Sequence, residues 1–361
     1  MEQSQGSLPF EAADSASAGA ATHALAGRAL PADPGVWDEL RHPQDGLRGA
    51  WQRFAGRLPP PRAGADIAAD LEQRRAQVAQ RIHLDGVTHN VFGVDGEAGA
   101  AAATARPWSL ELLPLLIEPA DWAAIEAGVA QRAQLLQLML ADLYGPQRLL
   151  HEGLLPPALL WRHPGWLRPA IGVQPPADLR LFIVAFDLGR GPDGRWSLVA
   201  QHTQGPSGLG YVLHNRRVIS GQFPDAFRDL RVQHIASSYR RLLDTLETLA
   251  ARCTGTAPDV PPRIALLTPG PHNETYFEHA YLARYLGFTL VEGGDLTVRD
   301  RRVFIKTLDG LQEQALAAHR QIAAFDQRQA EVARQVGVFE VGFAVRPRRQ
   351  QHDPRRVTVA G

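Results

Sequence analysis

The sequence predicts an α/β (α+β) protein, and three patterns carry that prediction. Residues 263–268 form a short, continuous apolar run, as expected for a central strand of a parallel sheet. A helical pattern over 276–286 separates this run from a second strand-like stretch at 288–296, which makes a βαβ unit, right-handed by default. Farther upstream, residues 179–200 predict a β-hairpin turned by an Asp-Gly pair.

The segments ahead of this hairpin are mostly helical in pattern. Residues 1–35 carry few large apolar groups, so they cannot offset chain entropy by burial and are expected to be disordered. Apolar spacing predicts one or two docking helices within 37–58 and an amphipathic helix over 67–82. Residues 86–93 alternate like a strand, and a long helix is expected over 119–143.

The segments after the hairpin follow the same logic. A helix is expected from about residue 235 to 252, and a small hairpin turns at residues 300–301. Beyond it, the Ala- and Gln-rich stretch 313–336 predicts a helix, and the Arg/Pro-rich end is expected to be unstructured.

Composition narrows the class of protein. The chain has 361 residues, 45% of them hydrophobic, and a formal net charge of +0, so it has no bulk electrostatic attraction for nucleic acid or anionic membranes. No apolar run approaches the roughly 20 residues that a membrane helix needs, and we recognise no secretory signal. The one cysteine, Cys253, fits a reducing, cytoplasmic location. Lys306 is the only lysine.

The stretch 201–216, with the sequence QHTQGPSGLGYVLHNR, is the main candidate site. Gly208 and Gly210 can adopt backbone angles that converge main-chain amides on one point, which favours an anion such as phosphate or carboxylate. The alternative is an ordinary glycine-rich loop between strand and helix. The remaining polar candidates for substrate or metal contact in this stretch are Gln201, Thr203, Gln204, Ser207 and Arg216.

A second candidate position follows the strand at 263–268. Asn273 and Glu274 lie at its carboxyl end, where open α/β sheets place ligands, and Glu292 follows the next strand. Equally, Asn273 would cap the following helix and Glu274 would complement its dipole. Both interpretations stay open at this point.

Four strings resemble the bacterial circularly permuted ATP-grasp type 2 family, a relative in fold of glutathione synthetase. They lie at 83–93, 141–157, 203–218 and 266–303, and the resemblance spans about 37–311. It implies an incomplete circularly permuted ATP-grasp fold with a βαβ, pre-ATP-grasp-like domain.

The expected domain layout follows from that resemblance. A disordered segment, 1–35, precedes the N-terminal part of the permuted module, 36–252, which contains the loop 201–216. An incomplete βαβ domain occupies 253–311. The tail, 312–361, is expected not to match the family and to contain a helix followed by disorder.

The resemblance also implies a reaction. These enzymes use ATP and Mg²⁺ to activate a carboxylate as an acyl phosphate, which an amine captures to form an amide. Carried over by position, Gln201 and Gln204 would face the metal, Thr203, Ser207, Gly208, Gly210, Asn273 and Glu274 would bind substrate, and Arg216 would be catalytic. Two departures stand out: Gln201 replaces an acid that Mg²⁺ prefers, and no lid lysine follows Leu311.

We therefore expect a truncated member of an ATP-dependent carboxylate–amine ligase family that is not catalytic alone. Its partners would be a small carboxylate or amine and a partner ligase subunit, not nucleic acid or membrane. The alternative is a non-catalytic module that binds a small anion or acts as a scaffold for a ligase subunit. A complete enzyme of another kind has less support, because no Ser-His-Asp order, Cys-His pair or HExxH string is present.

Overall fold

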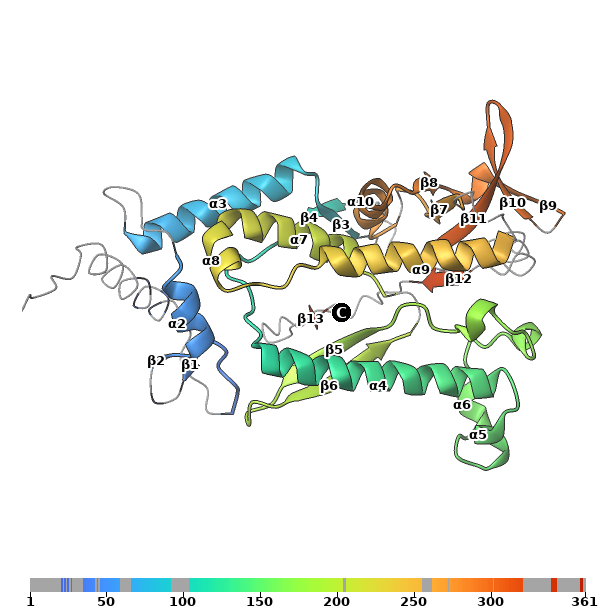
Figure 1. Cartoon of the computed structure of the whole chain (residues 1–361), viewed down its shortest axis with the longest axis horizontal. Helices are drawn as coiled ribbons and strands as arrows, with labels where there is room; N and C mark the ends of the chain where they lie inside the picture. The colour runs from blue at the N-terminus through green and yellow to red at the C-terminus, as the bar shows by residue number, and fades with distance from the viewer. Residues whose placement is uncertain are drawn as a thin grey trace, which may run out of the picture.

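The computed structural model describes most of the chain from residue 35 onward. The described residues are 21, 23, 25, 27, 35–42, 44, 46–58, 66–91, 104–203, 206–254, 262–271, 273–300, 302–320, 339–342 and 358–359. Figure 1 shows two parts, one above the other: helices α3, α7, α9 and α10 with a mixed sheet above, and helix α4 with strands β5 and β6 below. The expected α/β (α+β) class is confirmed.

The upper sheet contains the predicted βαβ unit. Strand β7 (Ile264–Leu267) pairs in parallel with β8 (Thr289–Val291), and α10 (Tyr276–Leu286) connects them. Gly287, at φ +77°, ends α10 in the left-handed conformation that glycine adopts without steric cost. The hairpin of β9 (Leu296–Arg299) and β10 (Arg302–Thr307) is also confirmed.

One predicted element in this sheet is wrong. Residues 313–320 belong to strand β11 (Gly310–Arg320), not to a helix. This strand lies between β10, its antiparallel neighbour, and β7, its parallel neighbour, and it also pairs with β12 (Phe339–Gly342). Backbone pairing on both sides overrides the helical propensity of its Ala, Gln and Glu residues. Residues 321–336 of the predicted helix lie outside the described residues.

The largest core lies among the helices of the upper part. Helix α3 (Ile67–Leu84) begins at Asp66, whose side chain accepts the Ala69 N–H at 2.6 Å, and it packs near α7 (Leu209–Gln222). Buried members of this core are Ala21, Leu25, Trp51, Phe54, Leu71, Val78, Ile82, Tyr211 and Phe223. Two of them, Ala21 and Leu25, come from the segment expected to be disordered.

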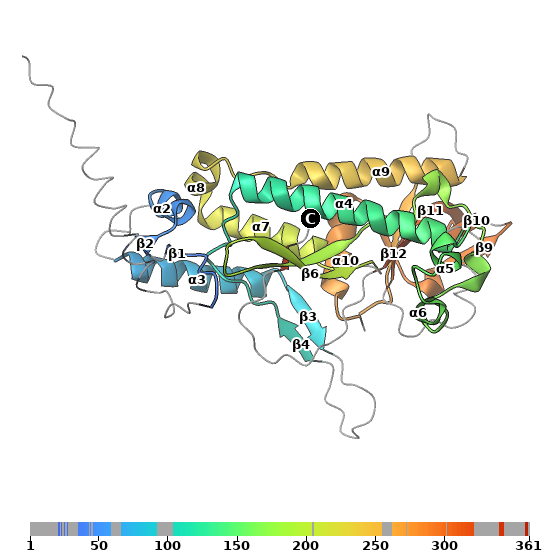
Figure 2. The same ribbon diagram turned by 90° about the horizontal axis from the view of Figure 1, so that it is seen from below.

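The lower part is a long helix on a hairpin. Helix α4 (Pro119–Leu143) starts with a proline in its first turn, as expected, and lies along the hairpin (Figure 2). Its Ile125 forms a buried cluster with Phe186 and Leu188 of the hairpin. Strand β5 (Ala185–Arg190) begins later than the pattern at 179 predicts, and β6 (Trp196–His202) extends further. Strand β13 (Thr358–Val359), from the tail expected to be unstructured, pairs with β5.

The remaining elements are short connections and one long helix. Their bounds are β1 (Arg41–His42), β2 (Gly46–Leu47), α2 (Gly49–Ala55), β3 (Thr88–Val91), β4 (Thr104–Pro107), α5 (Arg148–His151), α6 (Pro157–Trp161), α8 (Pro224–Asp229) and α9 (Ala236–Thr254), with 3₁₀ turns at Arg168–Ala170, Pro176–Asp178 and Gly293–Asp295. Within 37–58, the structure thus has a small hairpin and one helix.

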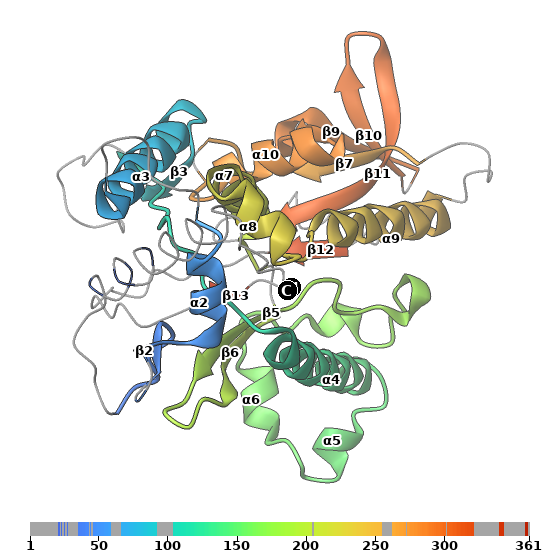
Figure 3. The same cartoon turned by 60° about the vertical axis from the view of Figure 1, so that its left-hand side comes forward.

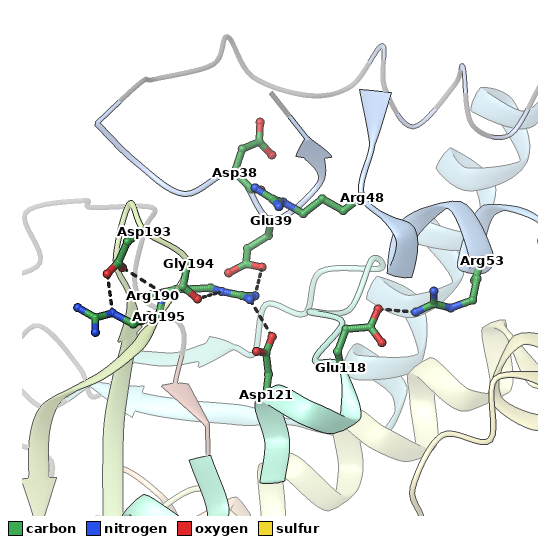
Figure 4. Close-up of polar contacts among 10 residues, drawn as sticks. All are labelled: Asp38, Glu39, Arg48, Arg53, Glu118, Asp121, Arg190, Asp193, Gly194 and Arg195. Atoms are coloured by element: carbon green, nitrogen blue, oxygen red, sulfur yellow. Dashed lines mark hydrogen bonds and ion pairs between the residues drawn. The ribbon is translucent and has the colours of Figure 1, made fainter. Parts of the chain in front are cut away.

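Arg190 fixes the N-terminal segment to the lower part (Figure 4). Its guanidinium nitrogens contact Glu39 at 3.1 Å and Asp121 at 2.7 Å, and its Nε donates to the Gly194 carbonyl at 2.8 Å. The guanidinium carbon also lies 4.5 Å from the centre of the Trp37 ring. We call these residues the Arg190 clamp. It joins β5, α4 and the chain segment before β1.

Candidate functional site

A cavity of about 860 Å³ lies between the two parts of the molecule. Its walls come from α2, the segment before α4 and the first turns of α4 on one side, and from α7, α8 and α9 on the other. Figure 3 shows α8 and α9 facing α4 across this region. Most lining side chains are apolar, including Phe54, Trp122, Val212, Phe227 and Leu230. Volume and lining are those of a small-molecule site.

Arg216 is the sequence-predicted residue that this cavity contains. It lies near the middle of α7, is half-buried, and places its guanidinium carbon 5.5 Å from the centre of the Phe227 ring. Burial lowers the pKa of the Arg216 guanidinium. Across the described part of the chain, no carboxylate forms an ion pair with it. A half-buried cation without an acidic partner is suited to bind an acid from solution.

The glycine loop does converge its amides on one anion, and that anion belongs to the protein. The N–H groups of Gly208 and Gly210 both donate to Oε1 of Glu278, each at 2.8 Å. Gly208 has φ +124°, and a Cβ on Gly210 would lie 2.8 Å from the Glu278 Cγ, so both positions favour glycine. The loop is also shorter than expected, because α7 begins at Leu209. In this structure the anion-binding geometry is engaged internally.

Glu278 itself is fully buried on the first turn of α10. Burial raises the pKa of its carboxyl to about 7, while the two amide donors act in the opposite direction. Its second oxygen, Oε2, is buried without a hydrogen-bond partner among the described residues. The carboxyl therefore changes its protonation near neutral pH.

The other predicted loop residues do not line the cavity. Gln201 and Thr203 are exposed at the end of β6, and Ser207 is half-buried between β6 and α7. Gln204 lies outside the described residues. The structure therefore brings Arg216 to the cavity and leaves Gln201, Thr203 and Ser207 elsewhere, so their role in binding stays a prediction.

Asn273 has a local structural partner. Its Oδ1 accepts both the backbone N–H and the hydroxyl of Thr275, each at 2.8 Å, and orders the turn that begins α10. Beneath this turn, Thr268 Oγ1 lies 2.8 Å from Nδ1 of His279, a buried ring whose pKa desolvation lowers to about 4. These contacts agree with the structural interpretation of Asn273. Glu274 is half-buried beside it, and neither residue lines the cavity.

The sequence did not predict several polar contacts between two of the stretches that resemble the family, 83–93 and 203–218. Nε2 of His214 lies 2.8 Å from Oδ2 of Asp85, which also accepts a bond from Arg81 at 2.9 Å. The Tyr211 hydroxyl donates to the Thr88 carbonyl at 2.7 Å. All of these residues but Arg81 fall in two of the strings, 83–93 and 203–218. Their presence in those strings was the available signal, and the structure shows that they hold α7 against the end of α3.

The described residues do not gather the ligands of a magnesium site. Gln201 is an exposed amide, and the Asp187 carboxylate on the paired strand contacts His202 at 3.1 Å. No group of three or more His, Cys, Asp or Glu side chains in the described ranges could hold a metal ion. Lys306 Nζ donates to the Gly294 carbonyl at 2.8 Å on β10. Among the described helices, none has the length and apolar character needed to cross a bilayer.

Comparison with known proteins gives a consistent family match. A model of the circularly permuted ATP-grasp type 2 family matches residues 114–349. The match runs beyond Leu311, so the expectation that the resemblance stops there is wrong.

Three relatives illustrate the similarity. The uncharacterized protein Rv2567 of Mycobacterium tuberculosis is 38% identical over 283 residues, which cover 77% of this chain and 31% of that protein. The uncharacterized protein sll0335 of Synechocystis is 37% identical over 266 residues, 72% of this chain and 53% of that protein. The uncharacterized protein ML0605 of Mycobacterium leprae is 32% identical over 275 residues, 76% and 46% respectively. The chain thus spans about a third to a half of these curated relatives.

Proposed function

Because the chain belongs to the circularly permuted ATP-grasp type 2 family, we propose that it recognises the acid substrate of an ATP-dependent carboxylate–amine ligase. The observation that carries this proposal is Arg216, a half-buried arginine without an acidic partner among the described residues, facing an apolar cavity. A carboxylate would complete the guanidinium's hydrogen bonding with two parallel bonds. The apolar walls would exclude water and strengthen that contact.

The proposal assigns binding to this chain and not the ligation itself. The family uses ATP and Mg²⁺ to activate the acid, but the described residues gather no set of ligands for the metal, so the role proposed for this chain is binding of the acid alone. Arg216 would hold and orient the carboxylate, and the cavity would keep water from it. Residues in the longer relatives, or a partner ligase subunit, would then complete the reaction. The single cysteine supports a cytoplasmic location.

Titration calorimetry with Mg-ATP and a hydroxamate assay test this proposal together. In the assay, the chain is incubated with Mg-ATP, hydroxylamine and a panel of small carboxylic acids, and any acyl phosphate is trapped as a hydroxamate. We expect no hydroxamate and no micromolar binding of Mg-ATP by the isolated chain. Turnover by the chain alone would contradict the non-catalytic part of the proposal.

A second candidate is a non-catalytic, small-anion-binding or scaffold module that partners a ligase subunit. The internal bond between the glycine loop and Glu278 favours the scaffold form of this candidate, because those amides are already engaged by the protein's own carboxyl. The substitution Arg216→Met separates the two candidates. Weaker binding of small carboxylic acids in this variant would favour the ligase substrate site in the cavity, and unchanged binding would favour the module.

A further inference from the structure

The cavity has a second unpaired arginine. Arg231, which unlike Arg216 is exposed, lines it from the connection between α8 and α9, and no ion pair joins it to any described carboxylate. The other charged lining residues are Arg53, Glu118, Glu126 and His234. Arg53 and Glu118 form an ion pair with each other (Figure 4), and Glu126 belongs to α4 on the opposite wall. The α7–α8–α9 wall is therefore the basic side of the cavity.

The backbone of Arg231 is held in an unfavourable conformation. Its φ is +50°, in the left-handed region that glycine and asparagine occupy more readily. It follows the C-cap residue Leu230 of α8, where glycine is the usual choice. Strained residues often serve a function that offsets their cost. Here the residue adds a cation to the basic wall of a cavity.

We propose that the cavity binds a dicarboxylate with an apolar or aromatic body, with Arg216 holding one carboxylate and Arg231 the other. The inference rests on the proposed function, since this ligand would be the acid that the chain recognises. A volume of about 860 Å³ far exceeds what a small dicarboxylate alone would fill, and the aromatic and aliphatic walls require an apolar partner. Glu118 is paired with Arg53, and Glu126 repels an anion from the α4 side, so the acidic groups lie against α7 and the α8–α9 connection.

Three probes dissect this ligand in calorimetric titrations without ATP. Phenylsuccinate carries the ring and both carboxylates, 3-phenylpropionate lacks one carboxylate, and succinate lacks the ring. We expect phenylsuccinate to bind at least about tenfold more tightly than either fragment, because each lost group removes one charged or apolar contact with the cavity. Equal affinity of phenylsuccinate and 3-phenylpropionate would overturn the assignment of a second anionic group. Equal affinity of phenylsuccinate and succinate would overturn the apolar body.

The substitution Arg231→Gly should lower the affinity for phenylsuccinate and raise the Tm of the protein. Removing the side chain should lower phenylsuccinate affinity roughly tenfold while leaving 3-phenylpropionate within about twofold. It should also raise Tm by about 2 °C, because glycine relieves the positive φ. Arg231→Asn, which also tolerates this conformation, should behave like Arg231→Gly in binding. The matched control is Arg228→Ala, which removes the same charge from α8 outside the cavity and should leave binding unchanged.

Unchanged phenylsuccinate affinity in Arg231→Gly would overturn the inference. Because these titrations contain no ATP, their failure is distinct from failure of the proposed function, which the hydroxamate assay reports. A chain that binds phenylsuccinate and also forms hydroxamate would keep the ligand assignment and lose the non-catalytic one.

Discussion

Two partly buried arginines in this molecule, Arg190 and Arg216, differ in the number of partners that the protein gives them. Arg190 is 15% exposed at its side chain and has two carboxylates, a carbonyl and an aromatic face as partners. Arg216 is half-buried too, yet among the described residues it contacts the face of Phe227 and no carboxylate. Withdrawing a cation from water is costly unless partners replace the lost hydration. In the Arg190 clamp, side chains and a carbonyl of the protein replace the lost hydration of the cation. In the cavity, a bound ligand would have to replace the lost hydration of Arg216.

Glu278 is the anionic counterpart and gives the largest expected effect. Its carboxyl has a pKa raised from 4.5 to about 7 by burial, so the folded protein binds a proton that the unfolded chain releases between these values. Stability from this group is therefore fully present below pH 4.5 and is lost as pH rises through 7. The loss amounts to about 3–4 kcal/mol, from roughly 1.4 kcal/mol per pKa unit.

Glu278→Gln tests that prediction, since the amide oxygen still accepts the bonds from Gly208 and Gly210 but does not titrate. Urea unfolding of both proteins between pH 4 and 8 should show the difference in stability growing in favour of the variant as pH rises. Parallel pH profiles would show that the two amides stabilise the anion as fully as the clamp stabilises Arg190.

Breaking the clamp should cost more than removing any exposed ion pair. Arg190→Met leaves Glu39 and Asp121 without their shared cation, so we expect a loss of about 2 kcal/mol, below the full value for buried pairs because both acids are partly exposed. The pKa of Glu39, already raised by burial, should rise further without Arg190. Arg195→Ala is the matched control: its side chain is 87% exposed, and its loss should cost less than about 0.5 kcal/mol. If both variants lose the same free energy of unfolding in urea, the Arg190 clamp stabilises the fold no more than an exposed ion pair does.

The glycine loop offers a paired test within one helix. Gly210→Ala would place a Cβ 2.8 Å from Glu278 Cγ and 3.2 Å from its carbonyl, so we expect a loss of about 1–2 kcal/mol from overpacking. Gly221→Ala, farther along α7, meets nothing within 4 Å and should gain about 0.5–1 kcal/mol from helix propensity. Thermal unfolding measures both. Stabilisation by both alanines would mean that α7 and α10 approach less closely than the structure shows.

The elements of the fold that could be predicted from the sequence are those whose sequence signals lie within a single segment. Helices α3, α4 and α10 and the β7–β8 pair follow from apolar periodicity and end signals within single segments. Strand β11 does not, because its partner at Ile264 lies about fifty residues away, and local propensity favours a helix.

The candidate site likewise has features that the local sequence predicts and features that depend on distant residues. Converging amides at Gly208 and Gly210 were predictable from glycine chemistry, but the anion they bind comes from 68 residues downstream of Gly210. Arg216 was a candidate through the family strings. Arg231 carried no signal, since nothing in a sequence marks an arginine with positive φ.

The smallest expected effect on stability is also the sharpest test of the comparison. Arg216→Met replaces a half-buried cation, which has no ion-pair partner in the described part of the chain, with an apolar side chain of similar length, so we expect no loss of stability and a gain of up to about 1 kcal/mol. Its neighbour Arg217, exposed and bonded to the Tyr281 hydroxyl at 3.1 Å, is the control: Arg217→Met should lose a few tenths of a kcal/mol, roughly the value of an exposed contact. Phenylsuccinate binding should fall at least about tenfold in the first variant and stay unchanged in the second. If Arg216→Met loses as much free energy of unfolding as Arg190→Met, then Arg216 stabilises the fold. The proposal that this cavity binds an acid would then fail.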